Sequence, residues 1–322
     1  MRRRTMLAQS GLALGAALSS AVASDQSKAV AAEQISLSAG ATETEPFVYG
    51  FNTSTIRGQN LPLPEEIDII ARAGFKSVEP WIREVDDYVK QGGALPDLAK
   101  RFRDAGLSVD SVIGFFDWIV DDDQRRAKAL EEARRNMELV AAIGGTRLAA
   151  PPGGATDVAG FDLNKAAQRY GELLALGNKM GVVPQVEVWG FSKTLGTLGE
   201  AAHVAINCGQ PNACILADVY HLYKGGSQIE GLRLLSGSSM HVFHFNDYPA
   251  TPPRHEINDA QRVFPGDGVA PLGEILRSLR DIGFRGVLSL ELFNREYWNQ
   301  DALLVARTGY DKMRAAVQKA LA

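Results

Sequence analysis

The sequence predicts a (β/α)₈ barrel that forms a single domain over residues 46–322, and three observations support this fold class. After Phe47, short apolar runs alternate with longer amphipathic segments, and eight such runs can be counted. A glycine stands at each of the seven junctions where an amphipathic segment gives way to the next apolar run. The length also fits, because eight strand–helix units close into a barrel at about 250 residues.

The apolar runs are expected to be parallel strands. Many are apolar almost without interruption, which is typical of strands that are covered on both faces. In chain order, the expected strands are residues 47–52, 77–81, 108–114, 147–150, 182–189, 213–218, 241–246 and 286–291.

The segments between these runs have the pattern of amphipathic helices. In residues 64–73, Pro64 suits a first helical turn, and Ile67, Ile70 and Ala71 form one apolar face. Residues 122–143 predict a long helix in which acidic residues come first, as the helix dipole favours.

The junction glycines are expected to adopt the left-handed conformation that closes a helix. They are Gly74, Gly106, Gly144, Gly181, Gly209, Gly237 and Gly283. The main alternative fold is an open, doubly wound sheet, which would require a glycine-rich turn after the first strand. Residues 52–55 read Asn-Thr-Ser-Thr instead, so the closed barrel is favoured.

The first 45 residues are expected to lie outside the barrel. Arg2-Arg3-Arg4 precedes a weakly apolar run, and small residues at 21–23 and 29–31 offer cleavage sites. This order predicts a twin-arginine-type signal peptide over residues 1–31, with a frayed amphipathic helix as the alternative. Residues 32–45 predict a flexible linker. We therefore expect the protein to be exported, to the periplasm or beyond the cell, by the twin-arginine route.

The composition excludes several classes of protein. The 322 residues are 45% hydrophobic and 22% charged, as in an ordinary globular chain rather than a disordered or fibrous one. The net charge of −4, without a Lys/Arg run beyond the first few residues, argues against a nucleic-acid partner. Two cysteines are too few for a disulfide framework or a thiolate zinc site.

Four residues that can bind a metal interrupt the apolar runs near the ends of the last four predicted strands. They are Glu187, Asp218, His244 and Glu291. In a (β/α)₈ barrel the carboxyl ends of the strands meet at one rim, so these side chains should converge. Neighbouring buried carboxylates repel one another, and a divalent cation removes that conflict. Three carboxylates and one imidazole suit one ion, with Mn²⁺ preferred and Co²⁺, Mg²⁺ or Zn²⁺ as alternatives.

This ligand set resembles that of the xylose-isomerase-like sugar isomerase and epimerase superfamily, which includes ketose 3-epimerases and inosose isomerases. Residues 259–268 are similar to an arginine-x-x-Pro-Gly-x-Gly loop of this family, and residues 282–297 resemble its inosose isomerase branch in particular. The segments Asp218-Val-Tyr-His221 and His244-Phe-Asn-Asp247 also match patterns of the family.

The resemblance implies an isomerase or epimerase that acts on a keto-sugar or keto-inositol through an enediolate. It implies that Glu187 and Glu291 are metal ligands and also the acid/base pair, while Asp218 and His244 hold the metal. His221 and Arg262 would bind substrate oxygens. The expected partner is a small-molecule carbohydrate. No stable membrane association is expected after the signal is removed, and a homo-oligomer is left open.

Weaker candidates for substrate binding lie at the same rim. Glu79 ends the second strand, where it could bind a hydroxyl, sit beside the metal site or form a salt bridge. Trp189 belongs to a group of aromatic residues at predicted strand ends that could pack against a sugar or belong to the core. Asp247 could contact the substrate or support His244. The other members of the aromatic group are Trp81, Phe115, Phe116 and Trp118.

Three other functions are alternatives to this one. The same metal and base could eliminate the aglycone of a 3-keto-glycoside, which would suit an exported lyase. Metal-dependent phosphodiester cleavage is disfavoured, because it predicts more histidine ligands and a basic face. A sugar-binding protein without catalysis would need no metal.

Overall fold

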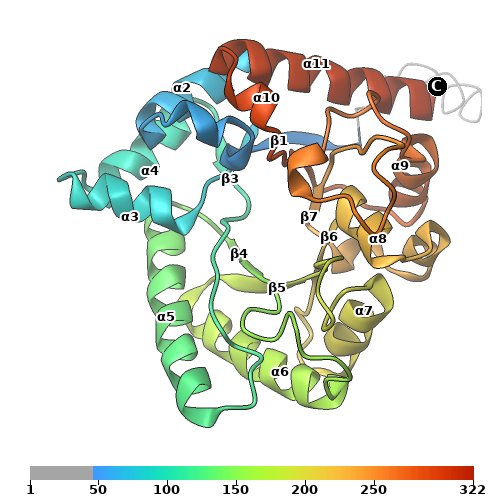
Figure 1. Ribbon diagram of the computed structural model, residues 1–322. Helices are drawn as coiled ribbons and strands as arrows, with labels where there is room; N and C mark the ends of the chain where they lie inside the picture. The colour runs from blue at the N-terminus through green and yellow to red at the C-terminus, as the bar shows by residue number, and fades with distance from the viewer. Residues whose placement is uncertain (1–45) are drawn as a thin grey trace, which may run out of the picture. The chain divides into compact units, whose positions relative to one another are not determined.

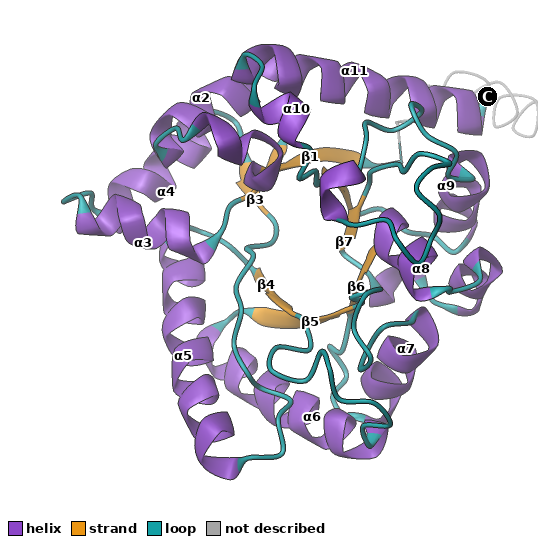
Figure 2. Cartoon of the chain, viewed as in Figure 1, coloured by secondary structure: helices purple, strands orange, loops and turns teal. Residues whose placement is uncertain are grey.

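A computed structural model describes residues 46–322 and confirms the predicted barrel (Figure 1). The predicted signal peptide and linker lie outside the described residues. Eight parallel strands surround a central axis and the helices form the outer layer (Figure 2). Within the described part of the chain, no helix is both long enough and apolar enough to span a membrane.

The strands follow one another around the barrel in the order β3-β2-β1-β8-β7-β6-β5-β4. The last gap is closed by a parallel bridge between Val112 and Leu148. Val112 N donates to Arg147 O at 3.1 Å, and Ala149 N donates to Val112 O at 3.0 Å. This closure excludes the open sheet. The strands are β1 Val48–Asn52, β2 Ser77–Glu79, β3 Ser108–Val109, β4 Arg147–Ala150, β5 Val183–Glu187, β6 Ile215–Asp218, β7 Val242–His244 and β8 Val287–Leu290.

The outer layer departs from one α-helix per strand in two places, because two helices follow β2 and a short and a long helix follow β8. 3₁₀ segments accompany the single α-helix after β1, β6 and β7. The helices are α2 Leu63–Ala73, α3 Ile82–Lys90, α4 Leu95–Asp104, α5 Asp123–Ala142, α6 Leu163–Met180, α7 Leu198–Asn207, α8 Val219–Gly225, α9 Leu272–Asp281, α10 Arg295–Trp298 and α11 Ala302–Leu321. The 3₁₀ segments are η1 Thr53–Gln59, η2 Ile229–Leu234, η3 Gly237–Ser239 and η4 Asp259–Gln261.

Six of the seven junction glycines have the expected left-handed conformation. Gly181, for example, has a φ of 70° and donates its N–H to Gly177 O at the end of α6. Gly237 is the exception, and the prediction for it is wrong. It lies in η3, and a Cβ there would come within 2.3 Å of the backbone of Gly283 and Phe284. Glycine is needed at this junction because two backbones approach closely, not because the chain turns left-handed.

The side chains that point into the barrel change from apolar to polar along the strands. Strand side chains alternate between two faces. Phe243 and Leu288 pack in the core beneath the helices, whereas Val242 and Val287 belong to a separate small cluster. His244 shares its face with Val242, two residues earlier, and Asp218 likewise shares its face with Leu216. Because every second side chain of a strand points inward, the inward-facing groups are apolar at the bottom of the barrel and ionisable at its top.

Candidate active site

Three metal-ligating groups meet where β6, β7 and β8 end. Asp218 pairs with His244 across the β6–β7 register, and His244 pairs with Ser289 across β7–β8. Glu291 follows Ser289 by two residues and faces the same way. In the described residues, one ligand atom from each of Asp218, His244 and Glu291 lies within 4.8 Å of the others. All three side chains are buried.

His244 presents its Nδ1 atom to the two carboxylates. This atom lies 3.2 Å from Glu291 Oε2 and 3.6 Å from Asp218 Oδ2. It is buried and has no hydrogen-bond partner in the described part of the chain. A buried nitrogen that makes no hydrogen bond and lies beside two carboxylate oxygens is a position that a metal ion would satisfy. The donor set therefore fits a divalent cation.

Glu79 lies behind His244 rather than in the wall of a cavity. Its Oε2 atom lies 2.8 Å from His244 Nε2 and accepts hydrogen bonds from Asn52 Nδ2 and Ser289 Oγ, both at 2.9 Å. Glu79 was predicted to bind a substrate hydroxyl, to sit beside the metal site or to form a salt bridge. The structure places it beside the candidate metal site in an ion pair with His244, where it orients the imidazole and leaves Nδ1 facing the other carboxylates. Asn52 and Ser289 were not singled out from the sequence.

The charges of this cluster depend on one another. Burial raises the pKa of Asp218, but Arg262 together with His221 and His244 outweighs burial and holds that pKa well below its usual value. Burial lowers the pKa of His244, but Glu291 and Glu79 together hold it well above its usual value. Burial also raises the pKa of Glu79, and the charge of His244 and its hydrogen bond bring it below normal. The neighbouring positive charges therefore keep Asp218 and Glu79 ionised despite their burial.

Glu187 is the fourth predicted ligand and lies at the end of β5. It lines the same cavity as Glu291 but does not belong to the tight group of three. Burial raises the pKa of Glu187 to about 8; the attraction of His244 opposes this effect and the repulsion of Glu291 adds to it. Its Oε2 atom is buried and has no hydrogen-bond partner among the described residues. Glu187 is therefore a carboxyl group that is held protonated near neutral pH and is close to the cluster.

Arg262 supplies a buried positive charge on the opposite side. Its Nη1 atom donates to Asp218 Oδ2 and to Glu291 Oε2, each at 2.8 Å. Its Nη2 atom contacts Asp259 and lies 3.0 Å from His221 Nε2. Only 1% of Arg262 is exposed. The residue therefore joins two of the predicted metal ligands to His221.

The loop that carries Arg262 is held in place by Asp247. Asp247 and Val263 form an antiparallel bridge, and the Asp247 carboxylate accepts hydrogen bonds from the backbone N–H groups of Gly266, Gly268 and Ala270. Asp247 was predicted to contact substrate or to support His244. In the structure its carboxylate oxygens accept hydrogen bonds from this loop instead, so Asp247 positions Arg262 indirectly.

His221 is buried at the start of α8, where its backbone N–H donates to Asp218 Oδ1 at 3.0 Å. Burial and, next, the charge of Arg262 together lower the pKa of His221 to about 4, against the opposing effect of the carboxylates around it. The imidazole is therefore neutral at physiological pH. Asn246, which was not anticipated, donates to both oxygens of Asp218 at 3.1 and 3.3 Å.

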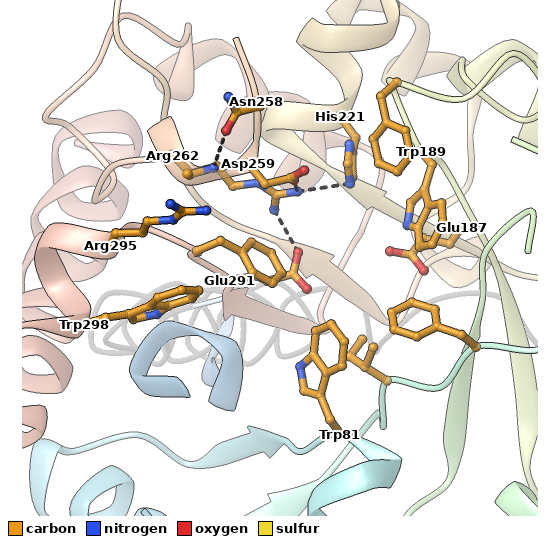
Figure 3. A pocket seen from close by; sticks show the side chains of 15 residues that line it. Trp81, Glu187, Trp189, His221, Asn258, Asp259, Arg262, Glu291, Arg295 and Trp298 are labelled. Atoms are coloured by element: carbon orange, nitrogen blue, oxygen red, sulfur yellow. Dashed lines mark hydrogen bonds and ion pairs between the residues drawn. The ribbon is translucent and has the colours of Figure 1, made fainter. Parts of the chain in front are cut away.

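A cavity of about 360 Å³ lies at the mouth of the barrel (Figure 3). Glu187, Glu291, His221 and Arg262 contribute polar groups, and Trp189 stands at the wall as predicted. The other aromatic candidates divide into two groups. Trp81 and Phe115 line the cavity, whereas Phe116 and Trp118 are buried in the core. Further lining residues are Ile113, Phe191, Asn258, Asp259, Ala260, Phe293, Arg295 and Trp298.

The chain belongs to the xylose isomerase-like TIM barrel family, whose pattern matches residues 67–316. It is 27% identical over 278 residues to the inosose isomerase of Bacillus velezensis, and the match covers 84% of this chain and 96% of that protein. It is also 27% identical over 243 residues to the 3-dehydroshikimate dehydratase of Pseudomonas aeruginosa, covering 72% of this chain and 36% of that protein. The solved structure of the IolI protein with a binding zinc atom shares the fold, with a TM-score of 0.79, 23% identity and coverage of 86% of this chain and 100% of that one.

Replacing Arg262 with glutamine should destabilise the metal-free protein strongly. Asp218 and Glu291 would remain buried without their positive partner, which costs about 3–5 kcal/mol when one member of a buried pair is removed. Urea unfolding in the presence of a chelator measures this loss. Arg295→Gln is the matched control, because Arg295 lines the same cavity but is exposed. Equal effects of the two substitutions would contradict the proposed charge compensation.

Glu187 should release its proton when a metal binds, if it becomes a ligand. Near pH 6.5 the carboxyl group is protonated in the metal-free protein, because its pKa is about 8. Calorimetry of metal binding in two buffers with different ionisation enthalpies counts the released protons. Glu187→Gln should lower the count by about one proton relative to the unaltered protein, whereas any proton from His244 is released in both. Identical counts would mean that Glu187 does not ligate the ion.

Proposed function

We propose that this protein is a divalent-metal-dependent isomerase or epimerase that moves a proton beside the ketone of a keto-sugar or keto-inositol. The observation that carries the proposal is the arrangement of Glu187 and Glu291. Both line one cavity, and Glu291 also belongs to the metal-fitting group with Asp218 and His244. Two carboxylates that face one substrate space beside a metal site suit the removal and return of a proton.

The family and the relatives make this chain an enzyme of the sugar isomerase and epimerase type. The B. velezensis relative is an inosose isomerase, and its match extends over most of both chains. This relationship supports a cyclic or open-chain polyhydroxylated ketone as the substrate class. We assign Mn²⁺ to the site because three carboxylates and one imidazole form a hard donor set, although the zinc in IolI makes Zn²⁺ the first ion to compare.

Asp218, His244, Glu291 and Glu187 would hold the metal, which supplies positive charge to polarise the ketone and stabilise the enediolate. One of the two glutamates removes the proton from the carbon beside the ketone, and a glutamate returns it at the neighbouring or opposite position. Arg262 and the neutral His221 provide groups that can hydrogen-bond substrate oxygens. Glu79 keeps the His244 ring oriented throughout, so the ligand geometry does not depend on substrate.

Elimination is a second candidate function, favoured by the similarity to a dehydratase. In a 3-keto-glycoside, a glutamate would take the proton from C2, the C1–O bond to the aglycone would break, and a C1–C2 double bond would form. The aglycone oxygen would receive a proton, so the step needs no oxidant, reductant or water. We also propose that residues 1–31 direct export by the twin-arginine route, which would expose the enzyme to glycosides outside the cytoplasm.

Exchange of substrate hydrogen with deuterated water tests the proposed function. We expect a metal-dependent incorporation of solvent deuterium into an inosose or a ketohexose, and loss of the exchange on chelation. Glu187→Gln and Glu291→Gln should each slow it by about 10²–10⁴-fold, the usual contribution of an acid/base group. Glu172→Gln on the exposed face of α6 is the control and should leave the rate unchanged.

The same experiment separates the two candidate functions. Deuterium in an intact sugar indicates isomerisation or epimerisation, whereas release of a free aglycone from a 3-keto-glycoside indicates elimination. The absence of both reactions in the metal-loaded protein would contradict the proposal.

A further inference from the structure

Aromatic side chains form a continuous wall on one side of the cavity. We call Trp81, Phe115, Trp189 and Phe191 the aromatic wall. Neighbouring rings along it are in contact, with centroids 5.2 Å apart for Trp81 and Phe115, 5.5 Å for Phe115 and Trp189, and 5.1 Å for Trp189 and Phe191. The wall reaches His221, whose ring lies 5.7 Å from that of Phe191. It therefore extends from the open mouth of the cavity to its polar interior.

Two members of the wall are unusually exposed. Phe115 is 44% exposed and Phe191 is 47% exposed, and they are the two aromatic side chains among the exposed large hydrophobic residues of the described chain. Both line the cavity. They come from different loops, Phe115 from the segment after β3 and Phe191 from the segment after β5. Exposed apolar groups that gather at one functional opening are typical of a binding surface.

Outside the aromatic wall, the cavity combines polar and charged side chains with four apolar ones, Ile113, Ala260, Phe293 and Trp298. Figure 3 shows Asn258, Asp259 and Arg295 on the side away from Trp189, and Glu187 beside Trp189. Glu187 and Glu291 are only 4% exposed, so the reacting groups lie deep in the cavity while the phenyl rings lie at its mouth. A small polyhydroxylated ring that reaches the glutamates would leave Phe115 and Phe191 in contact with water.

We propose that the substrate carries a planar aromatic group on its keto-sugar ring, and that Phe115 and Phe191 bind this group at the mouth. The substrate class is thus an aryl glycoside whose sugar has been oxidised to a ketone. This proposal rests on the proposed function, because it assumes that the keto ring occupies the space beside Glu187 and Glu291. The aromatic faces of Phe115 and Phe191 stack on the aryl group, and Arg295 and Asn258 leave room for polar substituents on its other side.

A pair of matched ligands tests this proposal. We would measure the dissociation constants of the phenyl and methyl glycosides of one 3-keto-sugar for the metal-loaded full-length protein. The phenyl glycoside should bind about tenfold more tightly, since burial and stacking of one ring supply an effect of this size. Phe115→Ala and Phe191→Ala should each reduce this preference by about threefold, and the double variant should abolish it. The affinity for the methyl glycoside should change by less than about twofold.

Leu304→Ala is the matched control, because Leu304 is an exposed apolar residue on α11 and does not line the cavity. Equal binding of the two glycosides, an equal loss of both in the phenylalanine variants, or binding of neither would overturn the proposal. A surviving phenyl preference without deuterium exchange or aglycone release would instead contradict the proposed function. Exchange into an inosose without any phenyl preference would contradict the aryl subsite alone.

Discussion

Compensation of buried negative charge is the constraint on which the rest of this structure depends. Four carboxyl groups, those of Glu79, Glu187, Asp218 and Glu291, lie at the top of the barrel with almost no exposure. Only two basic side chains, Arg262 and His244, face them in the contacts described above. Burial of an unpaired charge is expensive, so the carboxyl groups must share cations or keep a proton. The raised pKa of Glu187 shows the second solution, and a bound divalent cation would supply the first.

The barrel can hold these charged groups close together because its strands are fixed in register. Asp218 and His244 are direct neighbours in the β6–β7 ladder, and Glu291 extends the same inward-facing row of β8. The apolar layer beneath them anchors the strand ends, and the Asp247-held loop places Arg262 against them from above. The proposed metal ligands therefore rest on rigid elements, while the aromatic wall lies on the segments after β2, β3 and β5, where substrate preference can vary without disturbing the ligands.

Local patterns in the sequence were sufficient for the fold and for the candidate ligands. Alternating apolar runs and junction glycines located all eight strands, and charged residues that interrupted those runs identified the groups that converge at the rim. Contacts across the barrel could not be predicted in this way. Asn52 and Ser289 donate hydrogen bonds to Glu79, but they lie 27 and 210 positions away from it in the chain. No local signal in the sequence links them to Glu79. Gly237 has the sequence context of a helix-ending glycine, and only the approach of a distant backbone explains it.

We propose that one divalent cation binds through the imidazole of His244 and the carboxylates around it, and X-ray absorption of protein loaded with one equivalent of Zn²⁺ or Mn²⁺ is the decisive measurement. We expect one ion per chain, with a single imidazole nitrogen and carboxylate oxygens at about 2.0–2.2 Å, and loss of the nitrogen signal in His244→Ala. Tight binding with an unchanged spectrum in His244→Ala, or no stoichiometric binding at all, would contradict it.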